Sequence, residues 1–262
     1  MVINMELSKR LHMVASMVEK GSVAADVGCD HGYVSIWLVQ KGICPRVLAM
    51  DVNQGPLARA REHVEEAGLS SYIDLRLSDG LKGMDGKQAD TLLAAGIGGR
   101  LAARILREGA EKLSEMKWVI LQPQSEPWLV RRALEELGYA ITDENMVLEE
   151  GKFYGAVKAA NIRFLPQTES AAIDEAKKRP EGMALTEAQW RRLSECYGAF
   201  LIKKAHPVLM AYLESILHKH AWIRKKMERD ISCGRTAARM DALGEEDAYL
   251  DAALAWMRGG RM

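Results

Sequence analysis

The residues best suited to chemistry follow the first predicted strand, in the run Asp26-Val27-Gly28-Cys29-Asp30-His31-Gly32-Tyr33. A glycine-rich turn between a strand and a helix lets the backbone approach a ligand at the carboxyl edge of a parallel sheet. The run is not a dinucleotide fingerprint, because Asp30 stands where the middle glycine of G-x-G-x-x-G would be. A carboxylate there would repel a pyrophosphate and would suit the ammonium group of a cofactor that carries an amino acid. The turn therefore favours S-adenosylmethionine over NAD.

Two further carboxylates follow the next two predicted strands. Asp51 ends the second strand, 25 residues after Asp26, where an acidic side chain commonly accepts hydrogen bonds from both ribose hydroxyls. Asp79, in the turn Ser78-Asp79-Gly80 after the third strand, is placed to accept a hydrogen bond from an adenine amino group. Any single carboxylate at a strand end is as often a turn former as a ligand. Three at neighbouring strand ends predict a site for an adenosine-containing cofactor.

These residues need a parallel sheet to position them, and the sequence predicts one. Short apolar runs alternate with helical patterns, which is typical of a doubly wound α/β fold. The predicted strands are Val23–Val27, Val47–Val52, Ile73–Leu77, Thr91–Ala95 and Val119–Gln122, and an antiparallel hairpin, Ala140–Leu148 with Phe153–Ala159, closes the sheet. The predicted helices include 7–18, Pro56–Ala67 and Pro127–Leu137, the last two each starting at a proline and ending before a glycine.

Two more turns lie at the same predicted edge. After the fourth strand comes Ala94-Ala95-Gly96-Ile97-Gly98-Gly99-Arg100, which lacks the Asn or Asp followed by Pro-Pro that many amino-group methyltransferases carry. A small loop of this kind either lies against a flat base or the reactive methyl, or forms a tight turn and helix start. The fifth strand ends in Leu121-Gln122-Pro123-Gln124, which offers polar groups to the same cleft.

The last hundred residues have a different pattern. Composition turns polar and periodicity is lost between Pro166 and Gly182, which predicts a linker or a loop-rich joint. Beyond it, apolar residues recur at heptad-like spacing in three runs, with Pro207 between the first two and Gly234 between the last two. The sequence predicts an α/β domain over 1–162 and a helical domain over 163–262. Two or three long helices would form an antiparallel coiled coil there, or an ordinary helical subdomain.

Composition narrows the class of protein. The 36 basic and 36 acidic side chains cancel, so the overall charge demands neither a nucleic acid nor a membrane as partner. There is no apolar run of about 18 residues, as a membrane span requires. The four cysteines stand far apart, which argues against a metal site or a disulfide framework. We expect a soluble cytoplasmic protein without a metal, whose oligomeric state, a monomer included, is left open.

With these motifs, the chain resembles the bacterial tRNA methyltransferases that modify N1 of the adenine at position 22. The resemblance is carried by Leu7-Ser8-Lys9-Arg10-Leu11, Asp26 to Tyr33, Asp51-Val52-Asn53 with Gly55-Pro56, Ser78-Asp79-Gly80-Leu81, Ala95-Gly96-Ile97-Gly98-Gly99, Leu121-Gln122-Pro123, and Leu185-Thr186-Glu187 leading into Tyr197-Gly198. The chain departs from the family at Cys29, Gly32 and Ile97, where the family has Ser or Thr, Ala, and Met. None of these changes removes a titratable group.

The resemblance implies a Rossmann-like methyltransferase domain that uses S-adenosylmethionine, followed by a coiled-coil-like domain, and it supplies tRNA as the substrate. The cofactor-binding residues expected are Arg10, Asp26, Gly28, Asp30, His31, Asp51, Val52, Asn53, Asp79, Gly80 and Gly96. Asp30, His31 and Tyr33 are the catalytic candidates. Because neutral adenine N1 already presents a lone pair, catalysis would come mainly from positioning, and a carboxylate or imidazole would stabilise the cationic product. His31 is equally open to a purely local role in the turn.

Contacts to RNA phosphates are expected from basic residues. Lys9, Arg10 and Arg100 are the candidates near the cleft, and the densest positive stretch comprises Lys219, Arg224, Lys225, Lys226, Arg229, Arg235 and Arg239. A solvated helix face explains that stretch equally well. Two other functions stay open: a methyltransferase of the same fold that acts on a protein or a small molecule, and an inactive module that binds RNA or protein.

Overall fold

The computed structural model describes residues 5–227 and 234–259 of the 262-residue chain. It divides into two compact units, Met1–Ile173 and Asp174–Met262. The division falls inside a helix, eleven residues after the domain boundary predicted at 162/163. The predicted boundary at 162/163 separates domains that fold independently, which a division into compact units does not test, so it stays a prediction.

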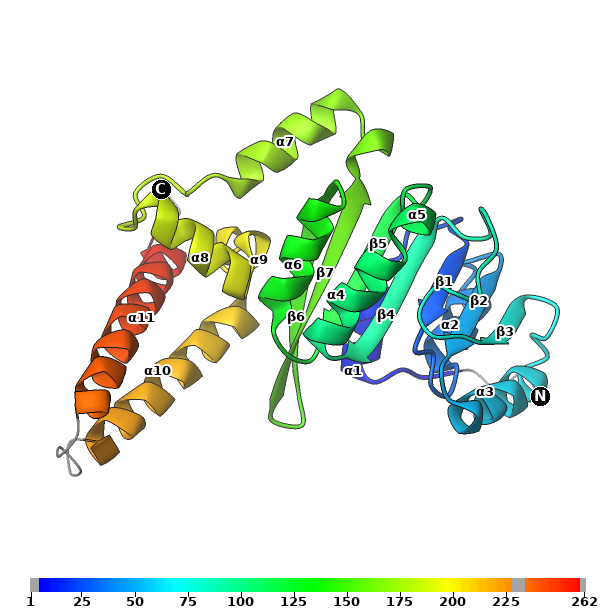
Figure 1. Ribbon diagram of the computed structural model, residues 1–262, viewed down its shortest axis with the longest axis horizontal. Coiled ribbons are helices and arrows are strands. Elements are labelled where there is room, and N and C mark those ends of the chain that lie inside the picture. The colour runs from blue at the N-terminus through cyan, green and yellow to red at the C-terminus, as the bar shows by residue number, and fades with distance from the viewer. Residues whose placement is uncertain (1–4, 228–233, 260–262) are drawn as a thin grey trace. The chain divides into compact units, whose positions relative to one another are not determined.

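The first unit is built on one seven-stranded sheet, drawn in Figure 1. Its strands are β1 (Ala24–Val27), β2 (Val47–Asp51), β3 (Ile73–Leu77), β4 (Thr91–Ile97), β5 (Trp118–Pro123), β6 (Tyr139–Glu149) and β7 (Lys152–Asn161), in the order β3-β2-β1-β4-β5-β7-β6. The first five are parallel, whereas β7 runs antiparallel to both β5 and β6. All five strands predicted as parallel and the closing hairpin are present, with ends that differ by one or two residues.

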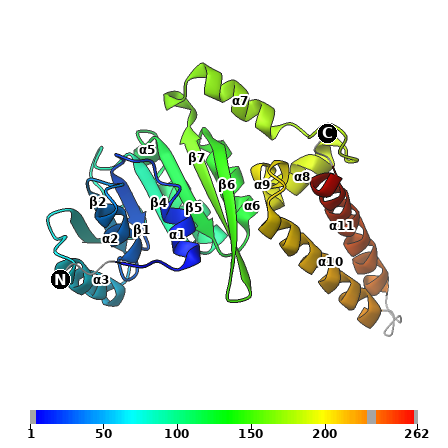
Figure 2. The same cartoon turned by 180° about the vertical axis from the view of Figure 1, so that it is seen from behind.

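Helices cover both faces of this sheet, as Figures 1 and 2 show from opposite sides. One face carries α1 (Lys9–Ala15), α2 (Tyr33–Gln40) and α3 (Gln54–Glu66), and the other carries α4 (Gly99–Glu108), α5 (Ala110–Leu113) and α6 (Pro127–Glu136). Every residue of β1 and β2 is buried. Strands buried on both faces are apolar without alternation, which explains why these two were visible in the sequence as continuous runs.

The hairpin between β6 and β7 turns on two residues, Glu150 and Gly151, with φ of 49° and 75°. Two consecutive left-handed residues make a type I′ turn, whose twist matches that of the paired strands. Just after β7, a short 3₁₀ helix over Ile162–Phe164 ends the sheet region.

The segment predicted as a linker or a loop-rich joint contains a helix, so the expectation of a loop-rich segment was wrong. Helix α7 (Gln167–Lys177) begins directly after Pro166. Its residues are mostly good helix formers, and only Ile173 is buried. A helix that is polar nearly all round has almost no apolar periodicity, so its sequence resembles that of a loop.

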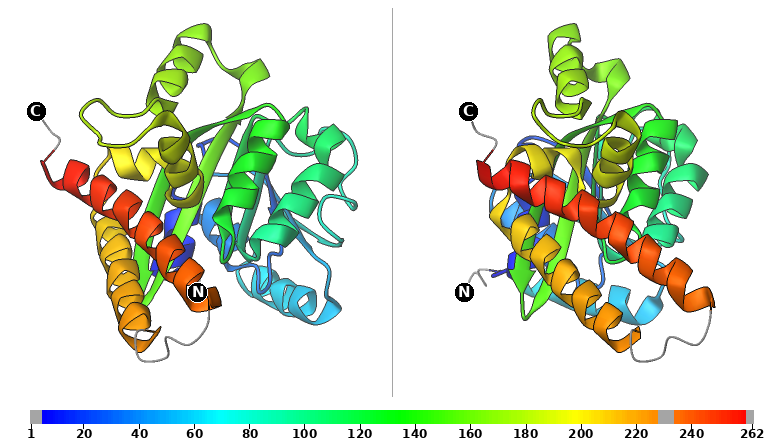
Figure 3. Two further views of the ribbon diagram at one scale, coloured as in Figure 1. Left: turned by 60° about the vertical axis from the view of Figure 1, so that its left-hand side comes forward. Right: turned by 90° about the vertical axis from the view of Figure 1, so that its left-hand side faces the viewer.

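The second unit is helical. It comprises α8 (Glu187–Tyr197), α9 (Ala199–Lys203), α10 (Pro207–Met227) and α11 (Gly234–Gly259), together with the end of α7. Helices α10 and α11 lie side by side (Figure 3), and Leu209 and Leu213 of α10 and Leu250 and Leu254 of α11 are buried. Pro207 and Gly234, predicted to separate the apolar runs, are the first residues of α10 and α11. Knobs-into-holes packing of a coiled coil stays a prediction.

One polar group is buried between these two helices. His220 Nδ1 lies 2.7 Å from Asp247 Oδ1, and Arg224 pairs with the other oxygen of the same carboxylate. Removing one partner of such a group leaves an uncompensated buried charge. Arg224 is therefore already paired with a carboxylate of α11. Along the described residues, no helix combines the length and apolar character needed to cross a bilayer.

Candidate active site

The predicted glycine-rich turn forms a tight loop between β1 and α2. Gly28, Asp30 and Gly32 have left-handed backbone angles, with φ of 76°, 49° and 75°. Glycine adopts this conformation freely, and aspartate is one of the few other residues that tolerate it. The amides of Gly28 and Cys29 both donate to the Met50 carbonyl, at 2.8 and 3.0 Å. The loop is therefore fixed to the end of β2.

Asp26 is the buried acid of the site, with 3% of its surface exposed. Its Oδ2 accepts a hydrogen bond from the Ser35 hydroxyl at 2.6 Å. Burial raises the pKa of the Asp26 carboxyl from 3.8 to about 6; the Ser35 hydrogen bond opposes this rise and the nearby Asp51 carboxylate adds to it. A cation brought close to Asp26 would favour its ionised form.

Asp51 connects the end of β2 to the glycine-rich loop. Its Oδ2 accepts from the Asp30 amide at 3.2 Å, and its Oδ1 accepts from the Asn53 amide at 2.8 Å. A carboxylate held by two backbone amides has a fixed orientation and still has lone pairs on both oxygens. Asp51 is thus prepared to accept two more hydrogen bonds from a ligand.

Asp79 follows β3 and is held by two cations. Lys82 Nζ lies 2.7 Å from its Oδ2, and Arg104 of α4 donates to its Oδ1 at 3.0 Å. Hydrogen bonds from Lys82 and then Arg104 are the largest causes that hold the pKa of Asp79 below its usual value. Asp79 therefore remains an ionised acceptor.

The loop after β4 is fixed by Gln122, which is fully buried at the end of β5. The Gln122 Oε1 accepts from the Gly96 amide at 3.1 Å and from the Arg10 guanidinium at 3.0 Å. Gly96 has φ of 78°, beside an irregularity in the β4–β5 pairing. The guanidinium of Arg10 also lies over the ring of Tyr154, 5.4 Å from its centroid. Gln122 thus brings a cation from α1 to the edge of the sheet.

The mouth of the site combines charged and flat apolar groups. The Asp30 side chain is 67% exposed, and its Oδ1 lies 3.5 Å from His31 Nε2. Tyr33, Val52 and Leu101 are exposed apolar side chains. Exposed apolar groups gathered at one opening mark a ligand or partner site, and flat ones suit an aromatic base.

All these groups line one cleft of about 510 Å³ at the carboxyl ends of β1 to β4. Every predicted site residue lies on its wall: Arg10, Asp26, Gly28, Asp30, His31, Tyr33, Asp51, Val52, Asn53, Asp79, Gly80 and Gly96. The structure therefore brings together the whole predicted set. The role assigned to each residue stays a prediction.

The sequence did not indicate two residues of this region. Arg104 projects from α4 to Asp79 and lines the cleft. His63 projects from α3, and its Nδ1 lies 2.9 Å from the His31 carbonyl oxygen. Both sit within ordinary helical patterns, so only the tertiary structure connects them to the site.

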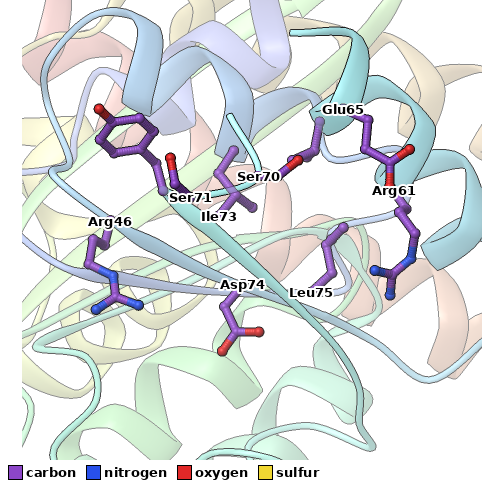
Figure 4. Close-up of a pocket in the computed structure, with 10 residues that line it drawn as sticks. Arg46, Arg61, Glu65, Ser70, Ser71, Ile73, Asp74 and Leu75 are labelled. Atoms are coloured by element: carbon purple, nitrogen blue, oxygen red, sulfur yellow. The ribbon is translucent and has the colours of Figure 1, made fainter. Parts of the chain in front are cut away.

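A second hollow, of about 300 Å³, lies beside the edge strand β3 and the end of α3. Figure 4 shows Arg46 and Arg61 on either side of Asp74 there. Asp74 is already paired with Arg76 at 2.6 Å. None of the predicted site residues lines this hollow, so the cleft at the carboxyl ends of the strands is the candidate active site.

Several of the predicted phosphate-contacting residues have other partners. Arg100 pairs with Glu126 at 2.9 Å, and Arg224 pairs with Asp247. Lys219, Lys225, Lys226 and Arg239 are exposed. Arg229 and the side chain of Arg235 lie outside the described residues.

The strand order reverses between β1 and β4, and the cleft lies at that switch point, where open α/β sheets bind their ligands. A parallel sheet closed by an antiparallel hairpin, with acidic residues after β1, β2 and β3, is a Rossmann-like methyltransferase fold. In the described residues, no group of three His, Cys, Asp or Glu side chains has an arrangement able to hold a metal ion.

Comparison with known proteins places the chain within that class. A family model described as a methyltransferase domain matches residues 7–157. The tRNA (adenine(22)-N(1))-methyltransferase of Bacillus subtilis is 37% identical over 155 residues, which cover 59% of this chain and 65% of that enzyme. The match thus spans just under two thirds of this curated relative. The chain belongs to the methyltransferase-domain family.

Solved structures agree with this assignment over most of the chain. The crystal structure of the B. subtilis M1A22 tRNA methyltransferase TrmK has a TM-score of 0.77 at 28% identity and covers 95% of this chain and 99% of that one. A putative tRNA (m1A22) methyltransferase of Streptococcus pneumoniae, solved in complex with S-adenosyl-L-methionine, has a TM-score of 0.71 at 30% identity and covers 95% and 100%.

Proposed function

We propose that this chain transfers a methyl group from S-adenosylmethionine to N1 of the adenine at position 22 of tRNA. The observation that carries the proposal is that Asp26, Asp51 and Asp79, from the ends of three neighbouring strands, line one cleft in a chain of the methyltransferase family. The activity of the B. subtilis relative and the cofactor bound to the S. pneumoniae structure support it. A cytoplasmic location, predicted from the sequence, belongs to the same proposal.

The residues of the cleft fit this cofactor. Buried Asp26 is bonded to the neutral Ser35 hydroxyl and lies near the Asp51 carboxylate, and an ammonium group would compensate its charge. Asp51 is oriented to accept from two ribose hydroxyls, and Asp79 is ionised and able to accept from an adenine amino group. Arg10, held by Gln122, supplies a cation for a carboxylate. One ligand thus has a group suited to each of these four side chains.

Bound S-adenosylmethionine supplies a methyl group activated by a sulfonium. The protein's task is to hold an unpaired adenine so that N1 lies in line with that group, at about 3–3.5 Å, which is the range of productive near-attack geometry. Neutral N1 needs no general base before attack. Val52, Leu101 and Tyr33 offer an apolar mouth for the base.

The product base carries a positive charge, which Asp30 and His31 are placed to stabilise. The Asp30 carboxylate stands at the cleft mouth beside the His31 imidazole. A carboxylate near a developing cation lowers the energy of the transition state if it is already oriented. The Asp30 backbone is fixed by Asp51, so its side chain starts from a defined place.

Incubation of the protein with labelled S-adenosylmethionine and an unmodified tRNA transcript tests the proposal. We expect label on N1 of the adenine at position 22, and none when that adenine is replaced by guanine. Label found only on protein or on small molecules would instead support the alternative function, a methyltransferase of the same fold that acts on those substrates. Cofactor binding without transfer to any of them would support an inactive binding module.

A further inference from the structure

Three aromatic rings meet at the mouth of the cleft. His31 and Tyr33 line it, and His63 of α3 lies against both. The ring centroids are 5.5 Å apart for His31 and Tyr33, 5.0 Å for Tyr33 and His63, and 6.0 Å for the two histidines. The planes of His31 and His63 lie at 15° and 22° to that of Tyr33. Each histidine ring is thus nearly parallel to the Tyr33 ring, and the two histidine rings are tilted by 37° to each other.

His63 is also bonded to the glycine-rich loop. Its Nδ1 lies 2.9 Å from the backbone oxygen of His31. A carbonyl oxygen only accepts, so this nitrogen carries the proton and donates it. The residues on either side of His31, Asp30 and Gly32, are both in the left-handed conformation. His63 therefore holds the loop by its backbone and the Tyr33 ring by contact.

The two histidines leave one face of the Tyr33 ring uncovered. Rings stacked on opposite faces of Tyr33 would have centroids at least about 7 Å apart, because each contact needs about 3.5 Å. The histidine centroids are only 6.0 Å apart, so the two rings do not enclose Tyr33 between them. Tyr33 is also 36% exposed. A planar ligand in the cleft mouth has a face to stack on.

We infer that His63 is a positioning residue for the acceptor base: it orients Tyr33 so that the open face of that ring stacks on the unpaired purine whose N1 is methylated. The inference rests on the proposed function. Base–aromatic stacking tolerates any base, so His63 would govern the placement of the base rather than its identity. His63 does not line the cleft itself and acts through Tyr33.

A double-mutant cycle tests this, with methyl transfer to tRNA and binding of S-adenosylhomocysteine measured for each variant. We expect His63→Ala to lower kcat/KM for tRNA about 10- to 100-fold, as small misplacements of a reacting group do. The dissociation constant for S-adenosylhomocysteine should change by less than about twofold. On a Tyr33→Leu background, His63→Ala should cause no further loss, because the residue through which it acts is gone.

Two more variants separate the parts of this role. His63→Phe keeps a ring beside Tyr33 and should recover part of the rate lost in His63→Ala. Glu62→Gln, at the exposed neighbouring position of α3, serves as the matched control and should behave as the wild type.

Three outcomes would overturn the inference while the proposed function stands. The first is an unchanged kcat/KM in His63→Ala. The second is a loss of S-adenosylhomocysteine binding as large as the loss of kcat/KM, which would mean that His63 only supports the loop. The third is that the losses in the two single variants add up in the double variant. Absence of transfer by the wild-type protein would instead overturn the proposed function and the inference with it.

Discussion

Asp26, Asp51 and Asp79 have the same side chain at equivalent strand ends, but their environments differ. Asp26 is buried and bonded to a hydroxyl, Asp51 is held by two backbone amides, and Asp79 is paired with two cations. The pKa of Asp26 is raised and that of Asp79 is lowered. The three carboxylates are therefore suited to different parts of one ligand.

The raised pKa of Asp26 predicts a pH-dependent affinity. With a pKa of about 6 in the free protein, Asp26 is mostly protonated at pH 5, and a bound ammonium group would lower that pKa. Affinity for S-adenosylhomocysteine should then fall as pH drops below 6, approaching about tenfold per pH unit. Calorimetric titrations at pH 5 to 8 check this. Asp26→Asn should bind more weakly and lose this dependence.

Stability should change in the opposite direction over the same window. The folded protein holds the Asp26 proton up to about pH 6, whereas the unfolded chain releases it near 3.8. The contribution of Asp26 to the free energy of unfolding therefore falls as pH rises from about 4 to 6. If Asp26→Asn left both pH profiles unchanged, the assigned environment of Asp26 would be wrong.

At this scale the sequence predicted residues that belong to a motif and missed those that do not. Asp26, Asp51 and Asp79 lie in or just after the last residues of apolar strands, a position visible in the chain. Arg104 lies on α4 and contacts Asp79, which is 25 positions away in the sequence. His63 lies on α3 and contacts the backbone of His31, which is 32 positions away. No local pattern contains such contacts.

Among the elements, the start of α4 shows why a glycine run needs a structure to be interpreted. A Cβ on Gly99 would lie 2.3 Å from the Ser125 carbonyl oxygen and 2.6 Å from that of Glu126. Gly99 is thus explained by close backbone packing between α4 and the turn before α6. Gly96, which lines the cleft with a left-handed backbone, is the glycine of this run that a ligand can reach.

Gly99→Ala should therefore destabilise the first unit. Backbone atoms block the added methyl group, so we expect a loss of at least about 1–3 kcal/mol, the usual range for overpacking. Denaturant unfolding followed by circular dichroism measures it. Gly98→Ala is the matched control, because its Cβ would meet only the Ser125 hydroxyl at 3.5 Å. Equal stability of the two variants would contradict the packing explanation.

The central strands β1 and β2 were predictable because burial on both faces makes them short apolar runs between turn residues. Strand ends were less predictable: β4 extends to Ile97 and β5 begins at Trp118, beyond the predicted limits, because pairing with neighbours continues there. Helix α7 was missed for the opposite reason. It buries only Ile173 and shows no apolar face.

Basic and acidic side chains balance over the whole molecule, but helix α10 carries more basic than acidic residues. Lys225 and Lys226 are exposed, and Lys226 lies 5.6 Å from the centre of the exposed Trp222 ring. Cations beside an exposed aromatic ring suit a nucleic-acid backbone with unpaired bases. The second unit is therefore the expected place for part of the tRNA contact.

Lys225→Ala combined with Lys226→Ala should weaken tRNA binding and leave cofactor binding unchanged. Losing two phosphate contacts should reduce the slope of log affinity against log salt by about 1–2. Filter binding at several salt concentrations measures this. Lys20→Ala with Lys87→Ala removes two exposed lysines of the first unit that do not line the cleft, and should have a smaller effect. Equal effects would indicate a general charge contribution.

The central claim is that the cleft binds S-adenosylmethionine through its carboxylates, and calorimetry with S-adenosylhomocysteine tests it most directly. We predict one binding site in the wild-type protein. Asp51→Ala should weaken it by at least about tenfold, since hydrogen bonds to a charged group contribute about 1.5–3 kcal/mol each. No heat of association at millimolar ligand, or full affinity in Asp51→Ala, would contradict the account.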